Sequence, residues 1–110
     1  MKKLSELFTD ESTWAQKMFT GFRPLPMLPP TPVSEADPTA NCFCLSEGIR
    51  RVYPAPYSDG EARRALRQLV IEAIHKLFPT REGGIINFND HRNTTFADIQ
   101  AVIREVESAK

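Results

Sequence analysis

Residues 58–78, SDGEARRALRQLVIEAIHKLF, decide the fold of this chain. Apolar residues recur in this segment at steps of three, four and seven, the period of a helix with one apolar face. They are Ala62, Ala65, Leu66, Leu69, Val70, Ala73, Ile74, Leu77 and Phe78. Ser58 and Glu61 have the spacing of a capping box, and Pro79 ends the helix because proline has no backbone N–H. The segment predicts one long amphipathic helix that covers a core.

The composition is that of one ordinary globular domain. Of the 110 residues, 41% are apolar and 25% charged, and 14 basic side chains balance 14 acidic ones. The balanced charge favours neither nucleic acid nor a membrane surface. No apolar run approaches the roughly 20 residues of a membrane span, and the N-terminus lacks the long apolar region of a signal peptide. Cys42 and Cys44 are too close along the chain for a structural disulfide, so we expect a reducing, cytoplasmic location.

Proline is concentrated in one segment, residues 23–38, which holds six of the nine prolines. Prolines remove backbone donors and fix φ, so this segment can be neither a helix nor a central strand. Leu25, Met27, Leu28 and Val33 lie between the prolines. Because a solvated linker would be more polar, we expect a proline-rich arm that lies extended across the core of its own domain. The alternative is a proline-rich ligand for an aromatic groove of another protein.

A second helix is predicted from Asp37 to about Val52. Aspartate is a common N-cap, and Pro38 fits the first helical position. Its apolar face would consist of Cys42, Leu45, Ile49 and Val52. A proline-stiffened connector at 53–57 leads into the long helix, so the two helices should pack together, the Cys42 face against Leu66, Leu69 and Ala73.

Shorter elements are expected near both ends of the chain. Residues 2–9 predict a short helix, and residues 14–19 either extend it or form a strand. After a turn at Gly83-Gly84, the β-branched residues in 85–88 predict a buried extended segment. Thr95 and Asp98 form a second capping-box pattern, which starts a last helix through Val106. Together these patterns predict a mainly α single domain, residues 1–110, of about four helices with a proline-rich arm and room for a minor β pairing.

Two cysteines and one histidine suggest a hydrolase or transferase as one hypothesis. A thiolate needs an imidazole or a helix N-terminus to lower its pKa, and a third group to orient the imidazole. Cys42 and Cys44 fall near a predicted helix start, and Asp90, His91 and Asn93 share one turn. Buried cysteine is more often a small hydrophobe than a nucleophile, and Asp and Asn are common in turns. We therefore predict no catalytic residue and keep Cys44, Cys42, His91 and Asp90 as weak candidates.

Metal binding by Cys42, Cys44, His75 and His91 is a weaker hypothesis. Zinc sites favour two to four residues between paired cysteines, whereas one residue within a helix sends the two side chains to nearly opposite faces. We predict neither a metal site nor a cofactor.

A basic cluster is the candidate surface for a partner. It consists of Arg50, Arg51, Arg63, Arg64 and Arg67. Residues 41–81 hold seven Lys and Arg against four Asp and Glu. These arginines could contact phosphates, which makes nucleic-acid binding the alternative function. A solvated helix face explains the same residues, because interspersed glutamates dilute the charge.

A polar cluster is predicted from Trp14, Gln16, Asn89 and Asp90. Trp14-Ala15-Gln16, then Cys44-Leu45, then Phe88-Asn89-Asp90 before a Thr-capped helix resemble an uncharacterised family of small domains in bacterial and phage genomes. That family typically shows Trp-x-Gln-Gly, Cys-Leu-x-Gly-Ala-Ile and (Trp/Phe)-Asn-Asp. Here Lys17 stands at the glycine of the first motif, and residues 46–49 only approximate the second. The resemblance implies a shared fold and identifies no reaction, because the family has no established activity. We expect Asn89 and Asp90 to bond backbone groups of residues 14–16 and so tie the N-terminal arm to the last helix.

The function ranked first is a non-catalytic protein-interaction or regulatory module, as in an accessory protein of a phage or mobile element. Small size, neutral charge and the weakness of every catalytic pattern favour it. The expected partner is a protein, with nucleic acid as the alternative and no membrane association.

Overall fold

A computed structural model of the chain describes residues 3–52 and 60–108. Its described part contains five α-helices, namely α1 (Leu4–Leu7), α2 (Leu45–Val52), α3 (Gly60–Leu77), α4 (Gly84–Asp90) and α5 (Phe96–Ser108), and one 3-10 turn at Glu11–Thr13. The strands are β1 (Thr20–Phe22), β2 (Thr31–Pro32) and β3 (Cys42–Phe43). They form an antiparallel sheet in the order β2-β1-β3. The chain is therefore mainly α with a small sheet, as the sequence predicts.

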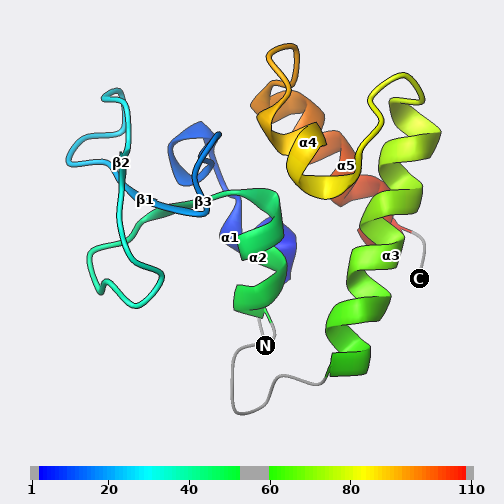
Figure 1. The fold of residues 1–110 in the computed structure, drawn as a ribbon, viewed down its shortest axis with the longest axis horizontal. Helices are drawn as coiled ribbons and strands as arrows, with labels where there is room; N and C mark the ends of the chain where they lie inside the picture. The colour runs from blue at the N-terminus through cyan, green and yellow to red at the C-terminus, as the bar shows by residue number, and fades with distance from the viewer. Residues whose placement is uncertain (1–2, 53–59, 109–110) are drawn as a thin grey trace.

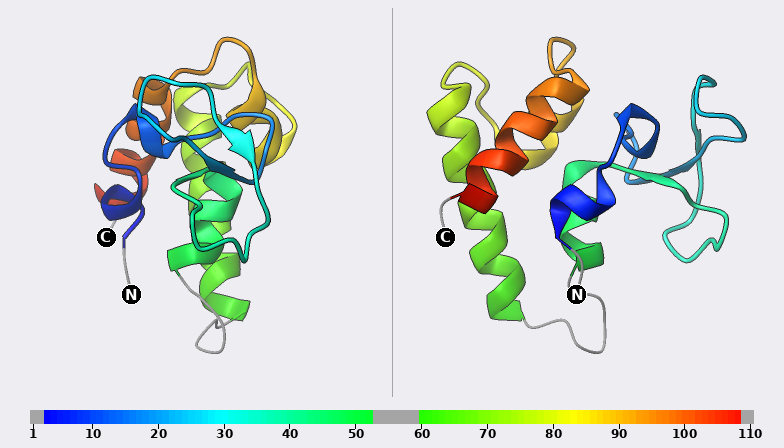
Figure 2. Two further views of the ribbon diagram at one scale, coloured as in Figure 1. Left: turned by 90° about the vertical axis from the view of Figure 1, so that its left-hand side faces the viewer. Right: turned by 180° about the vertical axis from the view of Figure 1, so that it is seen from behind.

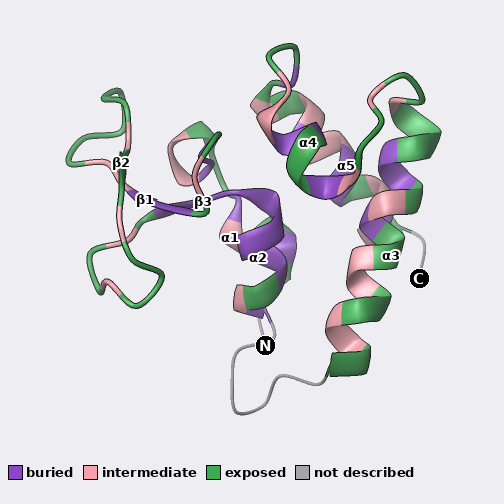
Figure 3. Cartoon of the chain, viewed as in Figure 1, coloured by how far each residue is buried: buried purple, intermediate pink, exposed green. Residues whose placement is uncertain are grey.

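Helices α3, α4 and α5 and the sheet occupy opposite ends of the molecule. Helix α3 packs against α4 and α5 at one end, while the sheet and its connecting loops extend from the other (Figures 1 and 2). Helices α1 and α2 lie between them and pack on each other. The buried residues gather on α2 and on the inward sides of α3, α4 and α5 (Figure 3).

The long helix is confirmed as α3, but its buried stripe is narrower than its sequence pattern. Val70, Ala73 and Ile74 are buried, whereas Leu69 and Leu77 remain 36% and 37% exposed. Only a narrow row of side chains can face α4, α5 and α2 at once, so the edges of the stripe stay at the surface. Ser58, and with it the first predicted capping box, lies outside the described residues.

The predicted start of the second helix at Asp37 is wrong, because α2 begins at Leu45. Asp37 instead caps a turn, its carboxylate accepting from the Thr39 N–H at 2.8 Å. Cys42 and Phe43 pair with β1, and the Cys44 N–H donates to the carbonyl of Phe19 at 3.0 Å. Backbone donors used in a sheet are not available to a helix, so the helix starts only after this pairing ends. The packing of α2 on α3 is observed, but Cys42 takes no part in it as a helical residue.

The extended segment predicted at 85–88 is also wrong, since these residues form α4. Ile85 and Phe88 are buried three residues apart, while Ile86 between them is 43% exposed. This is helical spacing, which four residues are too few to reveal. Gly83 before the helix and Gly84 at its first position have φ of 101° and 87°, a region that favours glycine. The extra helix raises the number from the predicted four to five within the described ranges.

The proline-rich arm does not lie across the core. Leu25, Met27 and Leu28 are 61%, 94% and 43% exposed. The arm folds back at Thr31–Pro32 to pair with β1, as the edge strand of the sheet. An edge position tolerates proline, because its missing N–H is not needed by a further strand.

The elements near the two ends follow their patterns more closely. The short helix α1 forms within the predicted range, with Leu4 and then Phe8 buried. At residues 14–19 neither alternative holds: Trp14 forms an isolated parallel bridge to Phe43 and the Ala15 N–H donates to the Phe43 carbonyl at 2.9 Å, but residues 16–19 bend and strand β1 begins only at Thr20.

The capping box of the last helix is confirmed. The Thr95 N–H donates to Asp98 Oδ2 at 3.2 Å, and the Asp98 N–H donates to Thr95 Oγ1 at 3.3 Å. These two bonds satisfy backbone donors that the first turn of α5 would otherwise leave unpaired.

Candidate functional site

A fully buried asparagine, Asn89, joins three separate parts of the chain. Its Oδ1 accepts from Trp14 Nε1 at 2.7 Å and from the Leu45 N–H at 2.9 Å. Its Nδ2 donates to the Ala15 carbonyl at 3.0 Å and to Asp90 Oδ1 at 2.9 Å. The side-chain amide thus uses both donors and both acceptor positions. The N-terminal segment, the start of α2 and the end of α4 are fastened to one group.

A second side chain, Gln16, extends this network to the turn before α5. Its Nε2 lies 3.0 Å from the Asn89 carbonyl, 3.2 Å from that of His91 and 3.4 Å from that of Thr94. The structure therefore brings Trp14, Gln16, Asn89 and Asp90 together. Sequence reasoning missed the Leu45 N–H, because a backbone donor leaves no signal in residue types.

Lys17 holds a conformation that favours glycine. Its φ is 62°, the only positive value among the described non-glycine residues. Its N–H donates to Asp90 Oδ1 at 2.7 Å, which helps to hold the turn in place. A left-handed residue with a Cβ costs about 1–2 kcal/mol. This gives a physical reason for the glycine that the resembling motif carries here.

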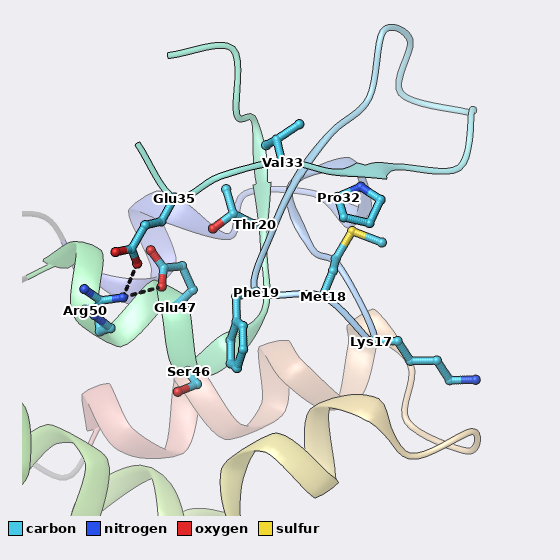
Figure 4. A pocket seen from close by; sticks show the side chains of 10 residues that line it. All are labelled: Lys17, Met18, Phe19, Thr20, Pro32, Val33, Glu35, Ser46, Glu47 and Arg50. Carbon is cyan, nitrogen blue, oxygen red and sulfur yellow. Dashed lines mark hydrogen bonds and ion pairs between the residues drawn. The ribbon is translucent and has the colours of Figure 1, made fainter. Parts of the chain in front are cut away.

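A cavity of about 590 Å³ lies beside β1. Its walls include Met18, Phe19, Thr20, Pro32 and Val33, with Glu47 and Arg50 of α2 at one end (Figure 4). The volume is in the range of ligand pockets in proteins, and the lining is apolar at Met18, Phe19, Pro32 and Val33 and polar or charged elsewhere. Sequence reasoning missed this site, because it forms only where the arm returns to β1.

A smaller hollow of about 210 Å³ adjoins the same segment. Lys17, Met18 and Phe19 line both hollows, and Cys44 and Ile86 contribute to the smaller one only. The Phe19 side chain is 58% exposed. An exposed aromatic ring therefore stands where two hollows meet.

The cysteines are in the wrong environment for a nucleophile. Both are free and buried, and burial raises the pKa of the Cys42 and Cys44 thiols above the ordinary value. A nucleophilic cysteine needs the opposite shift. Cys44 Sγ instead accepts the Glu47 N–H at 3.3 Å, at the start of α2, and His91 Nδ1 accepts the Asn93 N–H at 3.0 Å. The Cys44 thiol and the His91 imidazole thus each accept a hydrogen bond from a nearby backbone N–H.

The described residues contain no group of three or more His, Cys, Asp or Glu side chains arranged to hold a metal ion. His75 is exposed on α3, and Cys42 belongs to β3.

Most of the basic cluster is engaged with groups of the protein itself. Arg50 pairs with Glu35 and lies 3.1 Å from Glu47, while Arg51 lies 3.2 Å from Glu47. Arg63 donates to the Arg50 carbonyl at 3.2 Å. Arg67 donates to the Ser46 hydroxyl at 3.1 Å, and Arg64 is exposed on α3. The hypothesis of phosphate binding stays a prediction, and the carboxylates of Glu35 and Glu47 offset the charge of Arg50 and Arg51.

These features define a small helical domain in which a buried amide of α4 joins the N-terminal segment to the start of α2. The model of a family of unknown function, DUF6197, matches residues 3–109, and the chain belongs to that family. No curated protein and no solved structure matches the chain.

The described helices include none with the length and hydropathy that crossing a bilayer requires.

Proposed function

We propose that this protein is a non-catalytic interaction module that binds a partner protein through its arm face, defined as Phe19, Leu25, Met27 and Leu28. A cytoplasmic accessory role, as in a phage or mobile element, is part of this proposal. The observation that carries it is the exposure of large apolar side chains in this one stretch. Among the described residues, four of the seven exposed large hydrophobics belong to the arm face. Three of them, Leu25, Met27 and Leu28, lie within four residues of the chain, and exposed apolar groups gathered together are typical of interaction sites.

The way in which the arm is held supports this role. Arg23 donates to the carbonyls of Ser12 at 3.1 Å, Leu28 at 2.7 Å and Trp14 at 2.9 Å. The guanidinium thus fastens the loop that carries Leu25 and Met27 to the body of the domain. A loop held in advance loses less conformational entropy when a partner binds.

The test is capture of partners with the tagged full-length chain from lysate of the native host, followed by mass spectrometry. The variant L25E/M27E places two charges on the arm face and should lose the captured partner. The matched control, L69E/L77E, places two charges on exposed leucines of α3 and should retain it. The purified partner should then bind wild type and the control alike in calorimetry. Equal capture by wild type and L25E/M27E would overturn the proposal.

A gel-shift titration with duplex DNA and with RNA at low and moderate salt runs in parallel. Salt-sensitive binding that is lost on substituting Arg63 and Arg67 would place the partner on the basic cluster instead.

A further inference from the structure

We propose that the cavity beside β1 binds an extended, uncharged segment of the partner protein, with apolar side chains on both sides of Phe19. This inference rests on the proposed function for the nature of the ligand. It adds where on the domain the partner segment binds and which chemical character that segment has.

The first support is an unpaired hydroxyl in the cavity wall. Thr20 is only 2% exposed, and its Oγ1 is the one buried side-chain oxygen or nitrogen without a hydrogen-bond partner in the described part of the chain. Its backbone carbonyl already accepts the Val33 N–H at 3.1 Å, so the hydroxyl alone is left. Buried polar groups are nearly always paired, and an exception calls for an explanation. Figure 4 shows this hydroxyl turned toward the end of the cavity where Glu35 and Glu47 lie. A peptide group of a bound segment can supply its partner.

The second support is the balance of charge at that end. Arg50 pairs with both Glu35 and Glu47, and the Glu47 side chain is only 5% exposed. Arg51 further neutralises the Glu47 carboxylate, bonding to its Oε2 at 3.2 Å, and donates to the backbone carbonyl of Glu35 at 2.8 Å. A charged side chain entering here would compete with these pairs. An uncharged occupant leaves them intact.

The third support is the arrangement of two hollows around one ring. Phe19 lines the hollow of about 590 Å³ and the neighbouring hollow of about 210 Å³. A compact small molecule fills one hollow, whereas an extended chain carries successive side chains and can fill both. The large hollow also lies against β2, the edge strand of the sheet. An extended segment is therefore the occupant that fits the shape.

The test uses the full chain and a defined probe, the capped dipeptide N-acetyl-leucyl-leucinamide, followed by ¹H–¹⁵N NMR titration. The expected shifts centre on the amides of residues 17–20 and 33. The variant Thr20→Val keeps the shape of the side chain and removes the hydroxyl. It should weaken the probe about tenfold, as the loss of one hydrogen bond does, while the thermal midpoint of the free protein stays the same or rises. Thr20→Ser should restore most of the affinity.

Two further probes separate the alternatives. N-acetyl-lysyl-lysinamide and N-acetyl-glutamyl-glutaminamide should bind at least tenfold more weakly than the leucine probe, because a charge disturbs the Glu35–Arg50–Glu47 pairs. Octanol tests for a small amphiphile without peptide groups. Tighter binding of octanol, equal binding of a charged probe, or equal affinity of Thr20→Val and wild type would overturn the inference.

Failure here is distinguishable from failure of the proposed function. A partner whose capture depends on Leu25 and Met27, together with a leucine probe that does not bind, refutes the cavity alone. The opposite result is that the leucine probe binds in a Thr20-dependent manner while L25E/M27E captures the partner as well as wild type does. That result refutes the arm face as the partner surface and still supports the cavity as a binding site.

Discussion

Replacing Asn89 with alanine tests whether the buried amide holds the domain together. The substitution removes the bonds to Trp14 Nε1, the Leu45 N–H and the Ala15 carbonyl, and all three of these residues are buried. Each buried polar group left without a partner costs about 1–3 kcal/mol. We expect the free energy of unfolding to fall by about 3–9 kcal/mol in total, a large part of the roughly 5–15 kcal/mol that stabilises a domain of this kind.

Urea unfolding monitored by circular dichroism measures this loss. Trp14, the single tryptophan of the chain, gives an independent fluorescence signal from the same site. The matched control is Asn87→Ala, which removes an exposed amide two residues earlier in α4 and should change the free energy of unfolding by less than about 0.5 kcal/mol. A loss below about 1 kcal/mol for Asn89→Ala would refute the reasoning, since even one unpaired buried group should cost that much.

Asn89→Asp refines the same test. The shape is kept, but the second carboxylate oxygen would face the Ala15 carbonyl and Asp90 Oδ1, which are acceptors. Protonation supplies the missing donor. The variant should therefore lose less stability at pH 4 than at pH 7 relative to wild type. A larger deficit at pH 4 would contradict the hydrogen-bond assignment.

Three further predictions concern single positions. Lys17→Gly should raise the free energy of unfolding by about 0.5–1 kcal/mol in urea titration, because glycine relieves the positive φ; a lower midpoint would contradict this. Gly48→Ala should lower it by about 1–3 kcal/mol, because the new Cβ would lie 2.4 Å from Phe8 Cε2, and an unchanged thermal midpoint would argue against that contact. Because burial raises the pKa of the Cys42 and Cys44 thiols, a maleimide reagent should label them slowly at pH 7 and at the denatured rate only on unfolding; rapid labelling of the folded protein would revive the nucleophile hypothesis.

The long periodic segments were predictable from the sequence, whereas two of the shorter segments were not. The long helix and the last helix each span several turns, so their apolar periods and caps indicate their type. Residues 85–88 and 42–43 are too short for a period to show. Their conformation depends on what they contact, since β3 exists only because β1 lies beside it.

The polar cluster and the cavity also differ in how far the sequence predicts them. The bond between Trp14 and Asn89 involves side chains that short motifs single out, and the resemblance placed them in order along the chain. The cavity forms only because residues 31–33 return to lie beside β1. The Thr20 hydroxyl stands out only because it has no hydrogen-bond partner. Whether a buried hydroxyl lacks a hydrogen-bond partner depends on the folded structure, so residue types alone do not reveal it.

The amide of Asn89 has a consequence for the order in which this chain folds. Its partners Trp14, Ala15 and Leu45 lie 75, 74 and 44 residues earlier in the sequence. Closing loops of this length is entropically costly, and contacts this distant in sequence slow folding. During synthesis the N-terminal segment must wait for α4 to leave the ribosome before its buried tryptophan finds a partner. The native state is therefore reached only when nearly all of the domain has been made, and a chain stalled before residue 89 exposes the indole, the start of α2 and their unpaired donors together.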